Sequence, residues 1–222
     1  MTATKIGIVG AAGRMGRTLI EEVNATPSAV LAAAAERAGH DAIGQDAGTL
    51  AGLKPLGVVI AAKPEVVFAA CDVVIDFTTP KAAVLHAELA QKHKTALVIG
   101  TTGLDAAEAK KLQAAATAVP IVWAPSMSLG VNLLMVLTER VARALGPEYD
   151  IEILEMHHKH KVDAPSGTAL GLGEAAAKGR GVKLATVAAR GRDSARDAFA
   201  IHKPGLAAAG AQSRSPSTSA MS

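Results

Sequence analysis

The chain has 222 residues, of which 50% are hydrophobic and only 2% aromatic, and its formal net charge is +3. This length suits one large domain or two small ones, and an aliphatic composition suits a parallel sheet that helices cover on both faces. The mild charge argues against nucleic-acid binding, the lack of any apolar stretch near ~18 residues argues against a membrane span, and the single cysteine, Cys71, excludes an intrachain disulfide.

Short aliphatic runs alternate with longer alanine-rich segments in the first part of the chain. Helices are predicted at Met15–Val23, Lys81–Lys92 and Asp105–Ala118. The predicted strands are Lys5–Val9, Val30–Ala35, Val73–Asp76, Ala96–Ile99 and Ile121–Ala124, with a weaker candidate at Val58–Ile60. Alternating strands and helices form right-handed βαβ units, so we expect an α/β fold with a doubly wound parallel sheet of the Rossmann type. Because the first strand starts without a signal-peptide layout before it, we expect a cytoplasmic protein.

The pattern changes near Gly130, where we place a domain boundary. An amphipathic segment at Val131–Leu145, an alternating strand at Asp150–Met156 and a helix at Ser166–Lys178 follow. These predict a first domain at 1–129 and a smaller α+β domain at 130–193. From about Ser194 no periodic pattern remains, and the last ten residues contain five serines. Such a composition buries too little apolar surface to offset the chain entropy, so residues 194–222 are predicted to be a disordered tail.

A glycine-rich run, Gly10-Ala11-Ala12-Gly13-Arg14-Met15-Gly16, joins the first predicted strand to the first helix. Its glycines match a variant of the dinucleotide fingerprint, in which they allow a tight turn, approach of the pyrophosphate and close packing of helix on strand. The same glycines could also form an ordinary strand-to-helix turn. Glu36, about 20 residues further on, suits the carboxylate that binds the adenosine ribose. Arg14 or Arg37 could pair with a 2′-phosphate, so we expect both NADH and NADPH to bind.

Three histidines and two lysines lie within five positions, at His157-His158-Lys159-His160-Lys161. The helix start that follows offers free N–H groups and the hydroxyls of Ser166 and Thr168, which suit a carboxylate. The histidines and lysines can supply protons and positive charge to an anionic substrate during its reduction. The cluster could also be a solvated basic surface or belong to a simple helix cap. A zinc site is disfavoured because there is no cysteine pair and successive strand residues face opposite ways, so no metal is expected.

These motifs resemble the 4-hydroxy-tetrahydrodipicolinate reductase family of the diaminopimelate–lysine pathway. The resemblance runs in order from about residue 4 to about residue 193. Besides the glycine-rich run and the His-Lys stretch, it includes Glu36-Arg37, Asp76-Phe77-Thr78, Gly100-Thr101-Thr102-Gly103 and Ser128-Leu129-Gly130-Val131-Asn132. It implies a dinucleotide-binding domain, a substrate and oligomerisation domain, and a homotetramer. It also implies hydride transfer from NADPH or NADH to a small cyclic dicarboxylate, which loses its hydroxyl as water to give tetrahydrodipicolinate.

The resemblance implies roles for individual residues as well. His157 matches the catalytic acid/base residue and Lys161 the proton donor, and a cationic lysine would stabilise the charge that hydride addition builds toward the ring nitrogen. The expected substrate-binding residues are His158, Ser166, Gly167, Thr168 and Thr102. The expected cofactor-binding residues are Gly10, Ala11, Ala12, Gly13, Arg14, Met15, Glu36, Arg37, Gly100, Thr101, Thr102, Ala124, Pro125, Ser126 and Met127.

The family pattern weakens after Gly191-Arg192-Asp193, and the chain is shorter than family members. This departure predicts an incomplete substrate domain with open strand edges, and therefore lower stability, altered oligomerisation and reduced turnover. A shifted reading frame or an aberrant gene end would explain it. The alternative function is a catalytically impaired, dinucleotide-binding remnant of the reductase. Another small amino-acid dehydrogenase on the same scaffold is disfavoured by the His-Lys and Pro165-Ser166-Gly167-Thr168 stretch.

Overall fold

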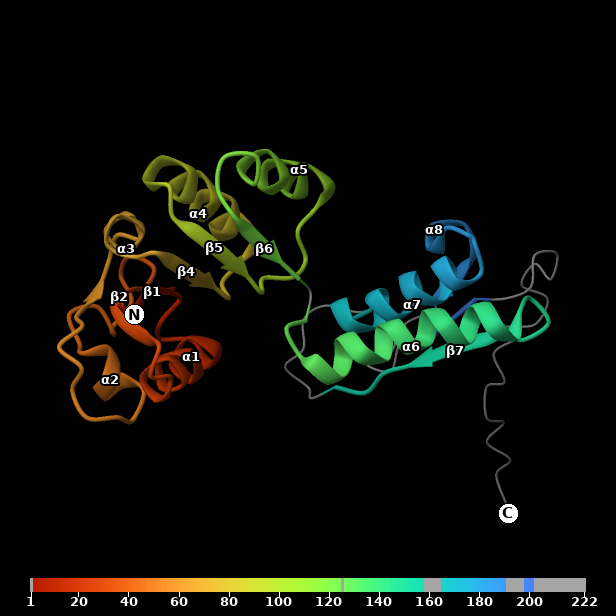
Figure 1. Ribbon diagram of the computed structural model, residues 1–222, viewed down its shortest axis with the longest axis horizontal. Helices are drawn as coiled ribbons and strands as arrows, with labels where there is room; N and C mark the ends of the chain where they lie inside the picture. The colour runs from red at the N-terminus through yellow and green to blue at the C-terminus, as the bar shows by residue number, and fades with distance from the viewer. Residues whose placement is uncertain (1, 125, 158–164, 191–197, 202–222) are drawn as a thin grey trace, which may run out of the picture. The chain divides into compact units, whose positions relative to one another are not determined.

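The computed structural model describes residues 2–124, 126–157, 165–190 and 198–201 (Figure 1). The chain divides into two compact units, an N-terminal unit at Met1–Met127 and a C-terminal unit at Ser128–Ser222. None of the helices in the described ranges has the length and apolar character that crossing a bilayer requires.

A six-stranded sheet forms the centre of the N-terminal unit, in the order β3-β2-β1-β4-β5-β6. All neighbouring strands in it are parallel. The strands are β1 (Thr4–Val9), β2 (Ala29–Ala35), β3 (Ile60–Ala61), β4 (Val73–Asp76), β5 (Ala96–Ile99) and β6 (Ile121–Trp123). The doubly wound Rossmann-type prediction is confirmed. Since the strand order reverses between β1 and β4, ligands are expected outside the carboxyl ends of these two strands.

Five helices connect these strands: α1 (Arg14–Ala25), α2 (Ala47–Leu50), α3 (Glu65–Ala70), α4 (Pro80–His93) and α5 (Ala106–Ala115). Pro80 suits the first turn of α4, because a proline has no backbone N–H that would need a hydrogen-bond partner there. Asp105 and Glu108 form a capping box at the start of α5. The sequence predicted α1, α4 and α5 but not α2 or α3. These two helices have four and six residues, fewer than two turns each, which is too short to show a 3.6-residue period.

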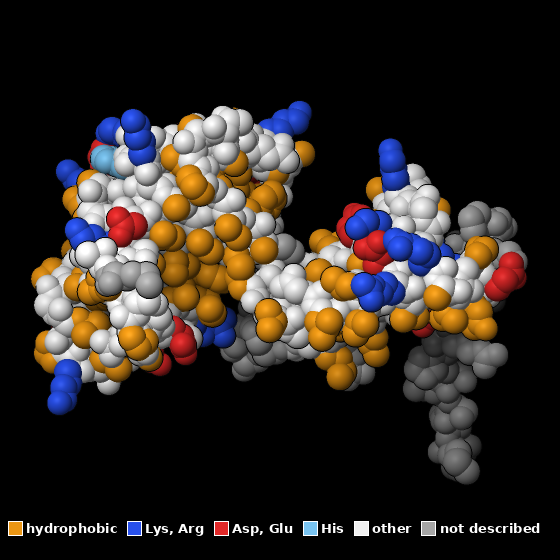
Figure 2. Space-filling model, in the orientation of Figure 1, with side chains coloured by type: hydrophobic (Ala, Val, Ile, Leu, Met, Phe, Trp, Pro, Cys, Tyr) orange, Lys and Arg blue, Asp and Glu red, His pale blue; other side chains and the backbone are white. Residues whose placement is uncertain are grey.

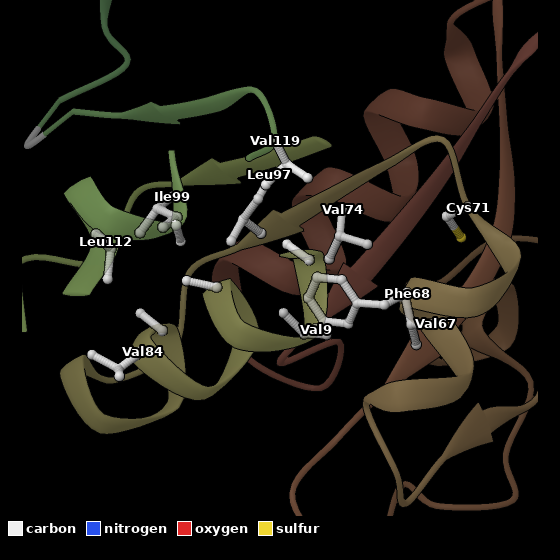
Figure 3. Close-up of a cluster of buried hydrophobic side chains, with 14 of the residues drawn as sticks. Val9, Val67, Phe68, Cys71, Val74, Val84, Leu97, Ile99, Leu112 and Val119 are labelled. Atoms are coloured by element: carbon white, nitrogen blue, oxygen red, sulfur yellow. The ribbon is translucent and has the colours of Figure 1, made fainter. Parts of the chain in front are cut away.

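Two clusters of buried side chains cover the two faces of this sheet. Figure 3 shows the one that includes Phe68, Val74, Leu97 and Ile99, together with Cys71. The other cluster includes Ile8, Ile20 and Ile60. Successive strand residues face opposite ways, so Val9 of β1 belongs to the first cluster and Ile8 to the second. The sheet is therefore buried on both sides, as its unbroken aliphatic strands predict.

The C-terminal unit is built from α6 (Leu129–Leu145), β7 (Ile151–Leu154), α7 (Gly167–Gly179), α8 (Leu184–Val187), β8 (Ala188–Arg190) and β9 (Ala198–Ile201). Its three strands form an antiparallel sheet in the order β7-β9-β8. Helices α6 and α7 approach closely, because a side chain at Gly179 would clash with the backbone of Glu139. Among the described residues of this unit, the buried hydrophobic side chains are mostly small, namely Ala142, Ala169, Ala176 and Ala177, with Leu184 the largest.

Strand β9 lies within the segment from Ser194 that the sequence predicts to be a disordered tail. Residues Ala198–Ile201 form the central strand of the small sheet, where they pair with β7 on one side and β8 on the other. Pairing with two neighbours satisfies the backbone groups on both sides of this strand, and that pairing depends on residues far away in the sequence. Residues 191–197 and 202–222, which include the serine-rich end, lie outside the described residues.

A row of aliphatic side chains runs along the exposed side of α6. Leu129, Leu133, Leu137, Val141 and Leu145 recur every four residues and are between 46% and 88% exposed. Figure 2 shows hydrophobic side chains along this unit. The helix therefore has two apolar sides, one packed against α7 and one exposed within this unit.

Candidate functional site

The glycine-rich run forms a tight connection between β1 and α1. Gly10 has a φ of +72°, which a side chain would disfavour. A Cβ on Gly16 would clash with the Gly10 carbonyl oxygen and lie 2.7 Å from the Ala11 carbonyl carbon, so only glycine permits this packing. Helix α1 begins after Gly13, which has no side chain to cap it. The N–H groups of the first turn therefore remain available for an anion such as a phosphate.

Glu36 lies beside this glycine loop, at the end of the neighbouring strand β2. Its Oε2 accepts a hydrogen bond of 3.0 Å from the Ala12 N–H, and its Oε1 accepts one of 3.0 Å from the Arg37 N–H. The structure thus brings together the two parts of the motif that the sequence separates by about 20 residues. They border a cavity of about 580 Å³, within the size range of small-molecule sites. Its other lining residues include Arg37, His40, Phe77, Thr78 and His86.

The segments after β4 and β5 lie side by side, because the two strands are parallel neighbours. A Cβ on Gly100 would lie within 2.6 Å of the Phe77 ring, so the ring packs directly against this glycine. Thr101 is 4% exposed, and its hydroxyl bonds to Asp76 and to the Thr78 N–H. Thr102, in contrast, is exposed. Of the two predicted threonines, Thr102 presents its side chain to solvent and Thr101 uses its hydroxyl inside the protein.

The remaining predicted cofactor residues lie at the same end of the sheet or in the glycine loop. Ala124 follows β6, and its N–H donates to the Ile99 carbonyl at 3.2 Å. Ser126 is partly exposed, and Met127 is 42% exposed. Arg14 and Met15 are exposed at the start of α1. Pro125 lies outside the described residues.

Ser166 begins α7 in the C-terminal unit. Its Oγ accepts a hydrogen bond of 3.0 Å from the Ala169 N–H, and the residue is 4% exposed. The hydroxyl predicted to bind substrate therefore caps its own helix. Gly167 and Thr168 follow in the first turn and are partly exposed. This turn offers N–H groups to a carboxylate, as the sequence predicts.

Glu155 connects the end of β7 to the start of α7, a contact that the sequence analysis missed. Its Oε1 accepts a hydrogen bond of 2.8 Å from the Ser166 N–H, and its Oε2 lies 2.8 Å from Nε2 of His157. Burial raises the pKa of Glu155, but the hydrogen bonds from Ser166 and His157 outweigh that effect and leave the pKa below its ordinary value. A signal for the His157 contact was present, since residues two apart on an extended segment share a face.

Several predicted residues of the His-Lys stretch lie outside the described residues. These are His158 and Lys161, together with Lys159 and His160 of the same cluster. Of this stretch the structure describes His157, whose side chain is 37% exposed. A zinc site would need His157, His158 and His160 as ligands, and His158 and His160 lie outside the described residues.

Comparison with known proteins gives consistent results along the chain. Residues 4–127 match the family model for the N-terminus of dihydrodipicolinate reductase, and residues 130–212 match the model for its C-terminus. The second match continues past Asp193, the point at which the sequence motifs of the family weaken. The 4-hydroxy-tetrahydrodipicolinate reductase of Dinoroseobacter shibae is 55% identical over 188 residues, which cover 85% of this chain and 70% of that protein. The enzyme of the same name from Sinorhizobium medicae is 53% identical over 193 residues, 86% of this chain and 71% of the relative.

A solved structure shows the same architecture. The dipicolinate-bound dihydrodipicolinate reductase of Paenisporosarcina sp. TG-14 matches with a TM-score of 0.62 at 25% identity, over 81% of this chain and 67% of that one.

Proposed function

We propose that this chain, which belongs to the dihydrodipicolinate reductase family, reduces 4-hydroxy-tetrahydrodipicolinate to tetrahydrodipicolinate with NADH or NADPH. The observation that carries the proposal is the 55% identity to a reductase of that name over 85% of the chain. The alternative, a catalytically impaired remnant that binds the nucleotide, is not better supported by these relatives. The bound dipicolinate of the Paenisporosarcina enzyme supports a dicarboxylate substrate.

The N-terminal unit fits a nicotinamide dinucleotide. The space that glycine leaves at Gly10 and Gly16, and the uncapped start of α1, suit a pyrophosphate. Each carboxylate oxygen of Glu36 accepts a hydrogen bond from one backbone N–H and has a further lone pair that can accept one from a ribose hydroxyl. Arg37 lines the cavity and Arg14 is exposed at the start of α1, and we assign both as candidate partners of a 2′-phosphate, in keeping with use of both nucleotides. When bound, NADH or NADPH supplies the hydride.

The C-terminal unit supplies the groups that handle protons and carboxylates in this proposal. Hydride addition to a conjugated imine builds negative charge at the ring nitrogen, and the family resemblance assigns Lys161 to stabilise it and donate the proton. His157 serves as the acid/base residue. Because its Nε2 donates to Glu155, its Nδ1 is the nitrogen that exchanges a proton.

Carboxylate binding is assigned to the start of α7. The N–H groups of Gly167 and Thr168 and the Thr168 hydroxyl are the donors, while Ser166 holds the helix start in place through its cap. His158 and Thr102 are the other residues that we assign to substrate on the family resemblance.

The test is loss of reduced-nicotinamide absorbance with purified protein and freshly generated 4-hydroxy-tetrahydrodipicolinate, with NADH and NADPH assayed separately. Turnover with either nucleotide is the expected result. Nucleotide binding without turnover would favour the impaired remnant instead. The ratio of kcat/KM for NADPH and NADH would give the cofactor preference.

We also propose a cytoplasmic enzyme that assembles as a homotetramer. The support for both is the family resemblance, and neither nucleic acid nor membrane is an expected partner. Light scattering coupled to size-exclusion chromatography would measure the mass in solution. A monomer at micromolar concentration would contradict the tetramer.

A further inference from the structure

A buried acid–base pair lies at the carboxyl end of β4. Asp76, the last residue of β4, is fully buried, and His86 of α4 is 5% exposed. Asp76 Oδ2 and His86 Nδ1 are 2.7 Å apart, and the His86 ring lies 5.8 Å from the Phe68 ring, centroid to centroid. A buried carboxylate is costly unless its oxygens are hydrogen-bonded, so this pair depends on its partners.

The second oxygen of Asp76 holds the segments after β4 and β5 together. Its Oδ1 accepts hydrogen bonds from the Thr78 N–H at 2.9 Å, the Thr78 hydroxyl at 2.6 Å and the Thr101 hydroxyl at 3.2 Å. The Thr78 N–H also approaches Thr101 Oγ1 at 2.9 Å. In addition, the Asp76 carbonyl accepts from the Gly100 N–H at 2.9 Å. One side chain thus ties together two segments that are more than twenty residues apart in sequence.

These two segments form part of the proposed nucleotide site. Phe77, Thr78 and His86 line the 580 Å³ cavity together with the glycine loop. Phe77 packs against Gly100, so the bonds that fix Thr78 and Thr101 also fix the ring between them. The Thr101 hydroxyl is already bonded within the protein, which leaves it no clear role as a direct donor to the nucleotide.

We propose that Asp76 and His86 are positioning residues for the nicotinamide nucleotide, and that Thr101 acts through Asp76 rather than by touching the cofactor. The inference rests on the proposed function, because it takes these segments as the nucleotide site. His86 keeps Asp76 Oδ2 bonded and so fixes the direction in which Oδ1 faces Thr78 and Thr101. Without that bond the buried carboxylate turns or admits water, and the two segments loosen.

The chain offers a natural probe of this effect. Trp123 is its only tryptophan, and its Nε1 donates to the Thr101 carbonyl at 3.2 Å. The emission of Trp123 therefore reports on the Thr101 segment, even before nucleotide is added.

The experiment compares four variants of the full chain. In His86→Leu, the Kd for NADPH is expected to rise about tenfold, the effect of losing one hydrogen bond to a buried charge, and the emission of Trp123 in the free protein is expected to shift. His86→Asn should have a Kd and an emission close to those of the wild type, because its side-chain amide can donate to Asp76 from near the position of Nδ1. Thr101→Val, which leaves the buried pair intact, should shift the emission and raise the Kd. Val84→Ala, in the same helix and the same core, is the control that lowers the melting temperature without either change.

The outcomes separate the inference from the proposed function. If His86→Leu and Thr101→Val lower the melting temperature but keep the wild-type Kd and emission, the pair is only structural and the inference is wrong. If His86→Leu does not fold, the Kd for NADPH and the Trp123 emission of His86→Asn and Thr101→Val decide the question. Binding that depends on His86 in a chain without turnover would contradict the proposed function alone. A wild-type chain that binds neither nucleotide would overturn both.

Discussion

The two units of the molecule bury their apolar side chains to different extents. The N-terminal unit has a six-stranded sheet with a cluster of large buried side chains on each face. In its described residues the C-terminal unit has three short strands, a core made mostly of alanines, and the exposed aliphatic row on α6. Burial of apolar area is the main source of folding free energy, at about 25 cal/mol per Å². The candidate nucleotide site therefore lies in a unit with its own large core, whereas His157 lies in a unit with a small one.

In each unit a buried or partly buried carboxylate joins two segments of the candidate site, and the carboxylate of the N-terminal unit is the more deeply buried. Asp76 is fully buried and makes four hydrogen bonds through its two oxygens. Glu155 is partly buried and makes contacts to Ser166 and His157. The more deeply buried group is the more strongly constrained, since an unsatisfied acceptor costs more where water is absent.

The largest expected effect separates chemistry from nucleotide binding. His157→Ala and Lys161→Ala should each lower turnover about 10²- to 10⁴-fold, the usual range for losing a positioned acid. The Kd for NADPH should stay near the wild-type value, because the proposed nucleotide residues belong to the N-terminal unit. Lys178→Ala, which removes an exposed lysine of α7 paired with Glu139, is the control and should keep near-normal turnover. Near-normal turnover in either test variant would remove that residue from the proposed mechanism.

Cys71 provides a probe of the N-terminal unit alone. Burial raises the pKa of its thiol from 9.0 to about 11, which lowers the thiolate fraction at neutral pH about 100-fold. Alkylation by iodoacetamide should therefore be slow in the native protein and become fast only when this unit unfolds. With rising urea, the helical signal in circular dichroism should fall first, as α6 and α7 unfold, and Cys71 should react later. Coincident transitions would show that the two units unfold together.

Two glycines test how tightly each unit is packed. A Cβ on Gly16 meets backbone atoms, which cannot move aside, so Gly16→Ala should cost about 1–3 kcal/mol of stability and weaken nucleotide binding. A Cβ on Gly171 meets the flexible end of Met135, at 2.5 Å from its Cε. Because alanine also favours a helix by about 1 kcal/mol, Gly171→Ala should be close to neutral. Urea midpoints measure both, and a larger loss at Gly171 would reverse the comparison.

Thr168 tests the proposed carboxylate site at the start of α7. Thr168→Ala removes one hydrogen bond to a charged group and should raise the KM for the dicarboxylate about tenfold, with a smaller change in kcat. Thr168→Ser, which keeps the hydroxyl, should recover most of the loss. An unchanged KM in steady-state kinetics would show that Thr168 does not hold the substrate.

The smallest expected effect concerns Glu155 and pH. Its pKa is lowered in the folded chain, so it contributes stability above its ordinary pKa near 4.5, and that contribution disappears as the pH falls through the lower folded value. Glu155→Gln should therefore be less stable than wild type at neutral pH, and the difference should shrink in acid. Thermal melts between neutral pH and pH ~3 measure this difference, with the exposed Glu152→Gln as control. A difference that stays constant with pH would mean that charge is not the cause.

Local sequence patterns were sufficient for most elements of the N-terminal unit and for linking the glycine-rich run to Glu36. The aliphatic runs of β1, β4 and β5 predict buried parallel strands, because a strand that is covered on both faces has no polar side. The glycine-rich run and Glu36 could be paired from their spacing, since successive strands of a βαβ unit lie next to each other. The break at Pro165 and the small polar residues after it located the start of α7, where Ser166 occupies the N-cap.

The tertiary structure decided the contacts between residues that no period connects. No sequence pattern indicates that His86 bonds to Asp76, that Thr101 turns its hydroxyl inward, or that Glu155 holds Ser166. Strand β9 was missed for the same reason, because its four residues are stabilised by partners on two other strands. Periodicity reports which face of an element is buried, and it depends only on neighbours along the chain. A hydrogen bond between distant side chains depends on the approach of two separate elements, which is fixed only when the chain has folded.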